Sequence, residues 1–115
     1  MEYRQLDDSG LKGTPICLGA MMFGSASNDK TLGRIVDSAR KHGVDFIDIT
    51  DGYSGGNSEK VLGRLLKKDR KYWVVATKIG NHPAPSSLDT CLGKGHMTTG
   101  IDESLNRLQT DWVDI

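Results

Sequence analysis

Short apolar runs alternate with amphipathic helical segments along most of this chain, and this alternation limits its possible folds more than any other feature. Apolar runs at residues 16–24, 44–49 and 72–78 have the length of buried strands. Segments with helical spacing of apolar residues separate them, and the apolar run at 111–115 follows another such segment. Parallel strands need a crossover connection, which a helix supplies, so the order predicts an α/β fold with parallel strands and covering helices.

The predicted helices have recognisable ends. Asn28 or Asp29 can cap the first helix, and Gly43 stops it after a basic last turn. Ser58 is the predicted cap of the second helix. The apolar face of this second helix comprises Val61, Leu62, Leu65 and Leu66. Both helices therefore have one face suited to packing on a sheet.

Three segments lie outside the regular alternation. Residues 3–16 are predicted to form a hairpin around a DDSG turn. Residues from 80 to about 98 are rich in Pro, Ser and Gly and are predicted to form a long loop. A last helix is expected to follow, with Ile101, Leu105 and Leu108 on one face, and Gly100 is expected to weaken it by about 1 kcal/mol.

Composition narrows the class of function. Lys and Arg number 15 and Asp and Glu also number 15, so no overall charge favours nucleic acid. No segment has the roughly 18 apolar residues of a membrane helix, which predicts a cytoplasmic protein without membrane insertion. Cys17 and Cys91 have no metal-ligand spacing and are expected to be buried or half-buried thiols. His82 and His96 fall in the predicted loop, so no metal site is expected.

Three side chains at the predicted carboxyl ends of strands can combine in proton transfer. Asp48 lies near the end of one strand and Lys78 ends the next, so a carboxylate and an ammonium group are expected on the same rim. Tyr53 lies in the loop directly after Asp48. A phenol is a poor acid at neutral pH, but a neighbouring cation stabilises its phenolate, and a carboxylate can orient that cation. Tyr53 is therefore expected to donate the proton, Lys78 to stabilise the phenolate of Tyr53, and Asp48 to position Lys78.

Four stretches in sequence order resemble the aldo-keto reductase family. FIDITDGYSGGNSEKVLGR resembles the signature in which Tyr follows a strand-ending Asp by five positions, and VVATK resembles the lysine strand. SLNRLQTDWVDI is similar to the helix and strand that come next. The opening YRQLDDSGLKGTPICLGAMMFG is similar to the subgroup of bacterial general-stress reductases and potassium-channel β subunits.

The resemblance implies the N-terminal portion of a (β/α)8 TIM barrel that uses NADPH to reduce a small carbonyl substrate, an aldehyde or a ketone. It implies catalytic roles for Asp48, Tyr53 and Lys78, with a fourth member, a His, beyond Ile115. Its implied cofactor contacts are Gly19, Ala20, Met21 and Asp48. A closed barrel takes about 250 residues, so residues 1–115 are expected to be a partial domain truncated in the fourth strand.

Two other functions stay open at this point. One is a non-catalytic regulatory or scaffold protein of the same fold that binds NADPH. The other is an inactive truncated product, because half a barrel leaves an exposed strand edge. The substrate's identity, the preference for NADPH over NADH and the oligomeric state do not follow from the sequence.

Overall fold

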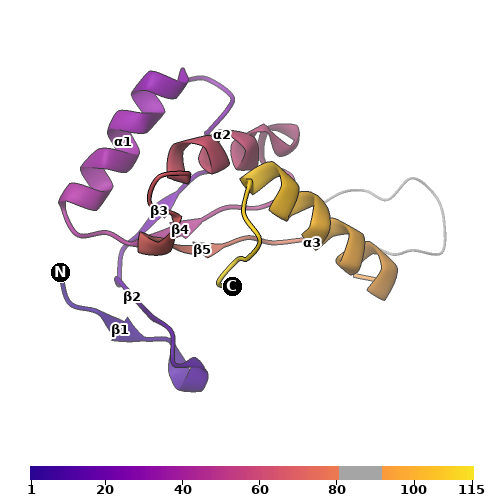
Figure 1. Cartoon of the computed structure of the whole chain (residues 1–115), viewed down its shortest axis with the longest axis horizontal. Helices are drawn as coiled ribbons and strands as arrows, with labels where there is room; N and C mark the ends of the chain where they lie inside the picture. Colours follow the sequence, from indigo (N-terminus) through magenta and orange to yellow (C-terminus); the bar gives the residue numbers. More distant parts are fainter. Residues whose placement is uncertain (81–91) are drawn as a thin grey trace.

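The computed structural model describes residues 1–80 and 92–115. His82, Cys91 and most of the predicted long loop lie outside the described residues. Within the described part, an N-terminal hairpin stands beside a parallel sheet, and helices cover that sheet (Figure 1). None of the described helices has the length and apolar character needed to cross a membrane.

The predicted N-terminal hairpin is confirmed. Strands β1 (Arg4–Gln5) and β2 (Lys12–Gly13) pair antiparallel, and the 3-10 turn η1 (Asp7–Ser9) joins them. The hairpin is tied to the main sheet just after β2, where the Thr14 N–H donates to Asp45 Oδ1 at 2.8 Å. It therefore lies against the end of the sheet at which the strands begin, apart from the helices (Figure 1).

The predicted parallel sheet is also confirmed, in the order β3-β4-β5. Its strands are β3 (Cys17–Gly19), β4 (Phe46–Asp48) and β5 (Val74–Ala76). The register aligns Gly19 with Asp48 and Asp48 with Ala76. Because side chains alternate along a strand, Ile47 and Val75 face the helices while Asp48 and Ala76 lie on the other face.

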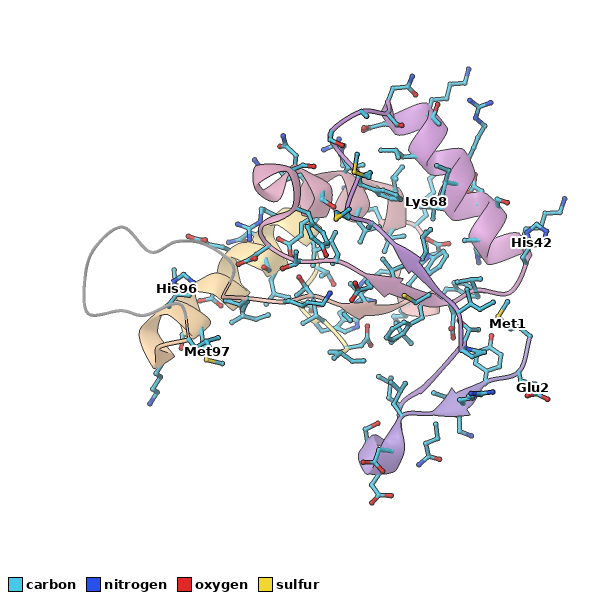
Figure 2. The ribbon with its side chains drawn as sticks, turned by 180° about the vertical axis from the view of Figure 1, so that it is seen from behind. Met1, Glu2, His42, Lys68, His96 and Met97 are labelled. Carbon is cyan, nitrogen blue, oxygen red and sulfur yellow. The ribbon has the colours of Figure 1, made fainter. Side chains whose placement is uncertain are left out.

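Helices α1 (Asp29–Lys41), α2 (Asn57–Leu66) and α3 (Lys94–Leu108) cover one face of the sheet (Figure 1). Asn28 caps α1 as predicted, since its side chain accepts from the Thr31 N–H at 2.9 Å. His42 ends this helix and lies near Met1 (Figure 2). The buried core between helices and sheet includes Leu32, Val36, Ile47, Ile49, Val61, Leu62, Leu66, Trp73, Val75 and Leu108.

The strands are shorter than predicted. The run at 16–24 forms a strand only to Gly19, because turns follow, including the Phe23 N–H to Ala20 carbonyl bond at 3.1 Å. Residues 111–115 form no regular strand, but the Asp114 N–H donates to the Val75 carbonyl at 3.0 Å. The expected fourth strand therefore lies beside β5 without a complete ladder.

Two expectations about the helices are wrong. Gly56, and not Ser58, is the N-cap of α2, because a left-handed turn ends at Gly56 and the Ser58 hydroxyl donates to the Ala20 carbonyl at 2.6 Å. Helix α3 begins at Lys94, so it includes His96, which Figure 2 shows on its first turns. Gly100 is buried, and a Cβ there would lie 2.9 Å from Ile79 Cγ2, so its small size lets α3 approach the chain after β5.

Candidate active site

Asp48 and Lys78 meet at the rim where the parallel strands end. The Lys78 ammonium donates to Asp48 Oδ1 and, at 3.0 Å, to the Ile49 carbonyl oxygen. Asp48 is the last residue of β4, and Lys78 follows β5 by two residues, so alternation places both on the face away from the helices. The structure thus brings together the carboxylate and the cation that the sequence placed on one rim.

Two residues of the β4–α2 connection hold the backbone of Lys78. The Thr50 hydroxyl donates to the Lys78 carbonyl at 2.9 Å, and the Asp51 N–H donates to the same oxygen at 3.1 Å. Thr50 and Asp51 are buried. Neither residue is among the site residues predicted from the sequence, although a polar Thr-Asp pair directly after a buried strand is a signal for such a contact.

Tyr53 lies in the turn between β4 and α2. It begins the 3-10 turn η2 (Tyr53–Gly56), and its N–H donates to the Thr50 carbonyl at 3.4 Å. Its half-buried side chain packs against the core. Among the described residues, no hydrogen bond joins the Tyr53 hydroxyl to Lys78 or Asp48. The structure therefore places the phenol in the connection after Asp48 without direct contact to the ion pair.

The residues expected to contact a cofactor lie beside Asp48. Gly19 aligns with Asp48 in the sheet, and the Ala20 N–H donates to the Asp48 carbonyl at 2.9 Å. Gly19 and Met21 are exposed, whereas the Ala20 side chain is fully buried. Ala20 can therefore offer a ligand little beyond its backbone.

Cys17 lies on the same face as Asp48, because it precedes the aligned Gly19 by two residues. It is exposed, so the expectation of a buried or half-buried thiol is wrong for Cys17. Desolvation raises the pKa of its thiol, the Asp48 carboxylate raises it further, and the Lys78 ammonium lowers it. The charges of Asp48 and Lys78 therefore act on the Cys17 thiol. The period-two alternation of β3 could have predicted that Cys17 lies on the face of Asp48.

A second ion pair lies on the helix side of the sheet. Glu59 is fully buried, and its Oε2 accepts from Arg107 Nε at 2.7 Å. Its Oε1 accepts from the Thr77 hydroxyl at 2.7 Å. No local pattern predicts this contact, because a Glu in the first turn of a helix is usually exposed.

A groove of about 630 Å³ lies between α2, α3 and residues 109–112. Leu66, Arg70, Leu108 and Trp112 are among its lining residues, and the guanidinium of Arg70 lies 4.6 Å from the Trp112 ring centre. This groove contains none of Asp48, Tyr53 and Lys78. It is therefore separate from the rim that carries the candidate site.

Comparison with known proteins identifies the family. A model of the Aldo/keto reductase family matches residues 15–115. The chain is 34% identical to a probable voltage-gated potassium channel subunit beta from Arabidopsis thaliana, over all of this chain and 36% of that protein. It is 32% identical to versiconal hemiacetal acetate reductase from Aspergillus parasiticus, over all of this chain and 41% of the relative.

Solved structures agree with this assignment. An aldo-keto reductase from Bacillus halodurans in its holo form superposes with a TM-score of 0.85 at 30% identity, covering 98% of this chain and 38% of that one. A crystal structure from Pseudomonas aeruginosa, also described as an aldo-keto reductase, superposes with a TM-score of 0.85 at 32% identity. The match covers 96% of this chain and 44% of that one. The chain spans about two fifths of the length of the curated relatives it matches. Its parallel sheet and covering helices correspond to part of the (β/α)8 barrel of the solved structures. This chain belongs to the aldo/keto reductase family.

Proposed function

We propose that the protein reduces an aldehyde or ketone with NADPH, and that Tyr53 donates the proton to the carbonyl oxygen. The observation that carries this proposal is the Lys78–Asp48 ion pair at the rim of the sheet, beside the connection that bears Tyr53. The versiconal hemiacetal acetate reductase among the relatives supports carbonyl chemistry. Residues 1–115 are then one part of the reductase domain, which acts in the cytoplasm on a small carbonyl compound.

The ion pair supplies what a phenolic proton donor needs. Proton transfer from Tyr53 leaves a phenolate, and a neighbouring ammonium group stabilises that negative charge. An ammonium has three N–H donors, of which Lys78 directs one to Asp48 and one to the Ile49 carbonyl. We assign the third to the Tyr53 oxygen, with Asp48 holding Lys78 charged and oriented. This contact requires the Tyr53 turn to move, as is common when a catalytic geometry tightens on binding.

The exposed end of β3 fits a nicotinamide cofactor. Gly19 is exposed, and a Cβ built there would meet nothing within 4 Å, so a flat ring can approach the backbone beside Asp48. Exposed Met21 can cover the same ring, and Asp48 can accept from a ribose hydroxyl. When bound, NADPH supplies the hydride that reduces the carbonyl carbon.

The test is a comparison of tyrosine variants in the protein as its gene encodes it. Tyr53→Phe is expected to lower the rate of NADPH-dependent aldehyde reduction by about 10²–10⁴-fold with NADPH affinity retained, because only the proton donor is lost. Tyr72→Phe is the matched control, since the Tyr72 hydroxyl donates to the Val44 carbonyl at 3.2 Å, away from the rim. Full activity in Tyr53→Phe would refute the role of Tyr53.

A second candidate is a regulatory protein that binds NADPH without turnover. The relative from Arabidopsis thaliana, a probable potassium channel subunit beta, is the observation that favours it. The two candidates separate in one measurement: the regulatory protein binds NADPH but consumes none in the presence of any aldehyde or ketone tested.

A further inference from the structure

The buried carboxylate of Glu59 joins three elements that surround the candidate site. Glu59 belongs to α2 and accepts from Arg107 of α3 and from Thr77, which directly follows β5, each at 2.7 Å. Its exposed fraction is 0%. A buried carboxylate is costly unless each oxygen has a strong donor, and here each does.

Thr77 links this carboxylate to the lysine of the site. Thr77 directly precedes Lys78, and alternation points their side chains to opposite faces of the sheet. The Thr77 hydroxyl is held from the helix side by Glu59, and the Lys78 ammonium reaches Asp48 on the other side. The end of β5 is thereby held by side-chain contacts on both faces of the sheet.

Arg107 links the same carboxylate to the turn that begins with Tyr53. That turn ends at Gly56, where φ is 86°, and a Cβ at this position would lie 3.0 Å from Arg107 Cδ. Ser104, also fully buried, accepts from Arg107 Nη2 at 3.2 Å. The guanidinium therefore lies directly against the last residue of the Tyr53 turn.

We infer that Glu59, with Arg107 and Thr77, is a positioning unit that sets the Lys78 strand end and the Tyr53 turn relative to each other. The inference rests on the proposed function for its effect on catalysis, but the placement of Lys78 can be measured without catalysis. Glu59 does not reach the reacting atoms, and it acts through Thr77 and Arg107.

The test removes the Thr77 hydroxyl and keeps the contacts that stabilise the fold. Thr77→Val removes the hydroxyl, keeps the branched shape and leaves Glu59 paired with Arg107, so the chain retains its buried ion pair. Thr77→Ser retains the hydroxyl and is the rescue variant. Thr98→Val is the matched control, because the exposed Thr98 hydroxyl donates to the Lys94 carbonyl of its own helix, at 2.9 Å.

Two readouts are taken on each variant. The first is the hydrogen-exchange rate of the Lys78 ammonium, followed by its 15N signal, and the second is the division of any rate loss between kcat and KM. Thr77→Val is expected to raise the exchange rate about tenfold and to lower kcat about tenfold with KM unchanged, because a bond to a charged group is lost. Thr77→Ser and Thr98→Val are expected to stay within about twofold of the wild-type exchange rate.

The outcomes distinguish the two proposals. An unchanged exchange rate in Thr77→Val overturns the positioning unit, whatever happens to kcat, and so does an equal increase in Thr98→Val or a failure of Thr77→Ser to restore it. An increased exchange rate in a protein that reduces no carbonyl compound removes the reductase proposal and leaves the positioning unit standing.

Discussion

Two carboxylate–cation pairs lie on opposite faces of the same sheet and differ most in their exposure. In the Asp48–Lys78 pair the side chains are 36% and 47% exposed, and in the Glu59–Arg107 pair they are 0% and 19% exposed. Water screens the first pair, so its contribution to stability is small and its charges remain accessible to a ligand. The second pair is enclosed between helices and sheet, where an unpaired charge is strongly unfavourable. The buried pair therefore matters mainly for the stability of the fold, whereas the exposed pair keeps its charges accessible to a ligand.

The largest effect is expected from removing the buried carboxylate. Glu59→Ala leaves the Arg107 guanidinium without its buried partner and is expected to lower the free energy of unfolding by about 3–5 kcal/mol. Urea denaturation followed by circular dichroism measures the change. Glu103→Ala is the control, because Glu103 is 62% exposed and lies 3.7 Å from the same guanidinium. Equal losses in both variants would contradict the contrast between buried and exposed carboxylates.

A smaller loss is expected from separating the helices that enclose the buried pair. Gly63 lies where α2 meets the end of α3, and a Cβ there would be 2.5 Å from the Leu108 carbonyl oxygen. Gly63→Ala is therefore expected to lower the free energy of unfolding by about 1–3 kcal/mol.

Gly33→Ala is the matched control for this substitution. Gly33 is inside α1, and its added Cβ would meet Leu65 Cδ2 at an ordinary 3.6 Å. This variant is expected to gain about 0.5–1 kcal/mol from helix propensity. Thermal melts measure both variants. If the melting temperatures of Gly63→Ala and Gly33→Ala shifted in the same direction, the close approach of α2 and α3 would not be the reason for the glycine at position 63.

The exposed pair should contribute little to stability. Asp48→Asn is expected to change the free energy of unfolding by less than about 1 kcal/mol, because solvent screens both partners. The exposed Arg64–Asp29 pair offers a control in Asp29→Asn, with side chains 48% and 53% exposed. A loss in Asp48→Asn that approached the loss in Glu59→Ala would remove the distinction between the two pairs.

The smallest effect is expected on the reactivity of Cys17. Its raised pKa leaves less thiolate at a given pH than an ordinary thiol has, so alkylation by iodoacetamide should be slow at pH 8 and rise at higher pH. Because the folded thiol holds its proton more tightly than the unfolded one, its contribution to stability is complete below the unfolded pKa. That contribution is lost as the pH rises through the folded pKa.

Two variants report how the charges of the site act on this thiol. Asp48 raises the pKa of Cys17 and Lys78 lowers it, so Asp48→Asn should speed alkylation at pH 8 and Lys78→Met should slow it. The rates are followed by mass spectrometry in each variant and in the wild type. Identical rates in all three proteins would show that Cys17 does not sense the ion pair.

Local signals in the sequence account for much of the fold. The cap at Asn28, the stop at Gly43 and the alternating apolar runs predicted the order of strands and helices because each depends on neighbouring residues. The same reasoning placed Asp48 and Lys78 on one rim, since the ends of parallel strands converge. Those residues were predictable because the parallel sheet itself was.

Contacts between distant residues account for what the sequence did not reveal. Ser58 had the residue type and position of a helix cap, but it bonds to the Ala20 carbonyl, 38 residues away. Glu59 had the position of an exposed helix residue, but Arg107 lies 48 residues further along the chain and makes its burial possible. The shortened strand after Gly19 likewise follows from turns that pack Phe23 into the core.

The N-terminal hairpin offers a practical handle on the protein. It joins the sheet beside Asp45, where β4 begins, whereas Asp48 and Lys78 occupy the finishing ends of the strands. Its tip, η1, contains no buried residue. A fluorophore, an affinity tag or a solid support attached at Asp8 would therefore leave the opposite rim open to ligands.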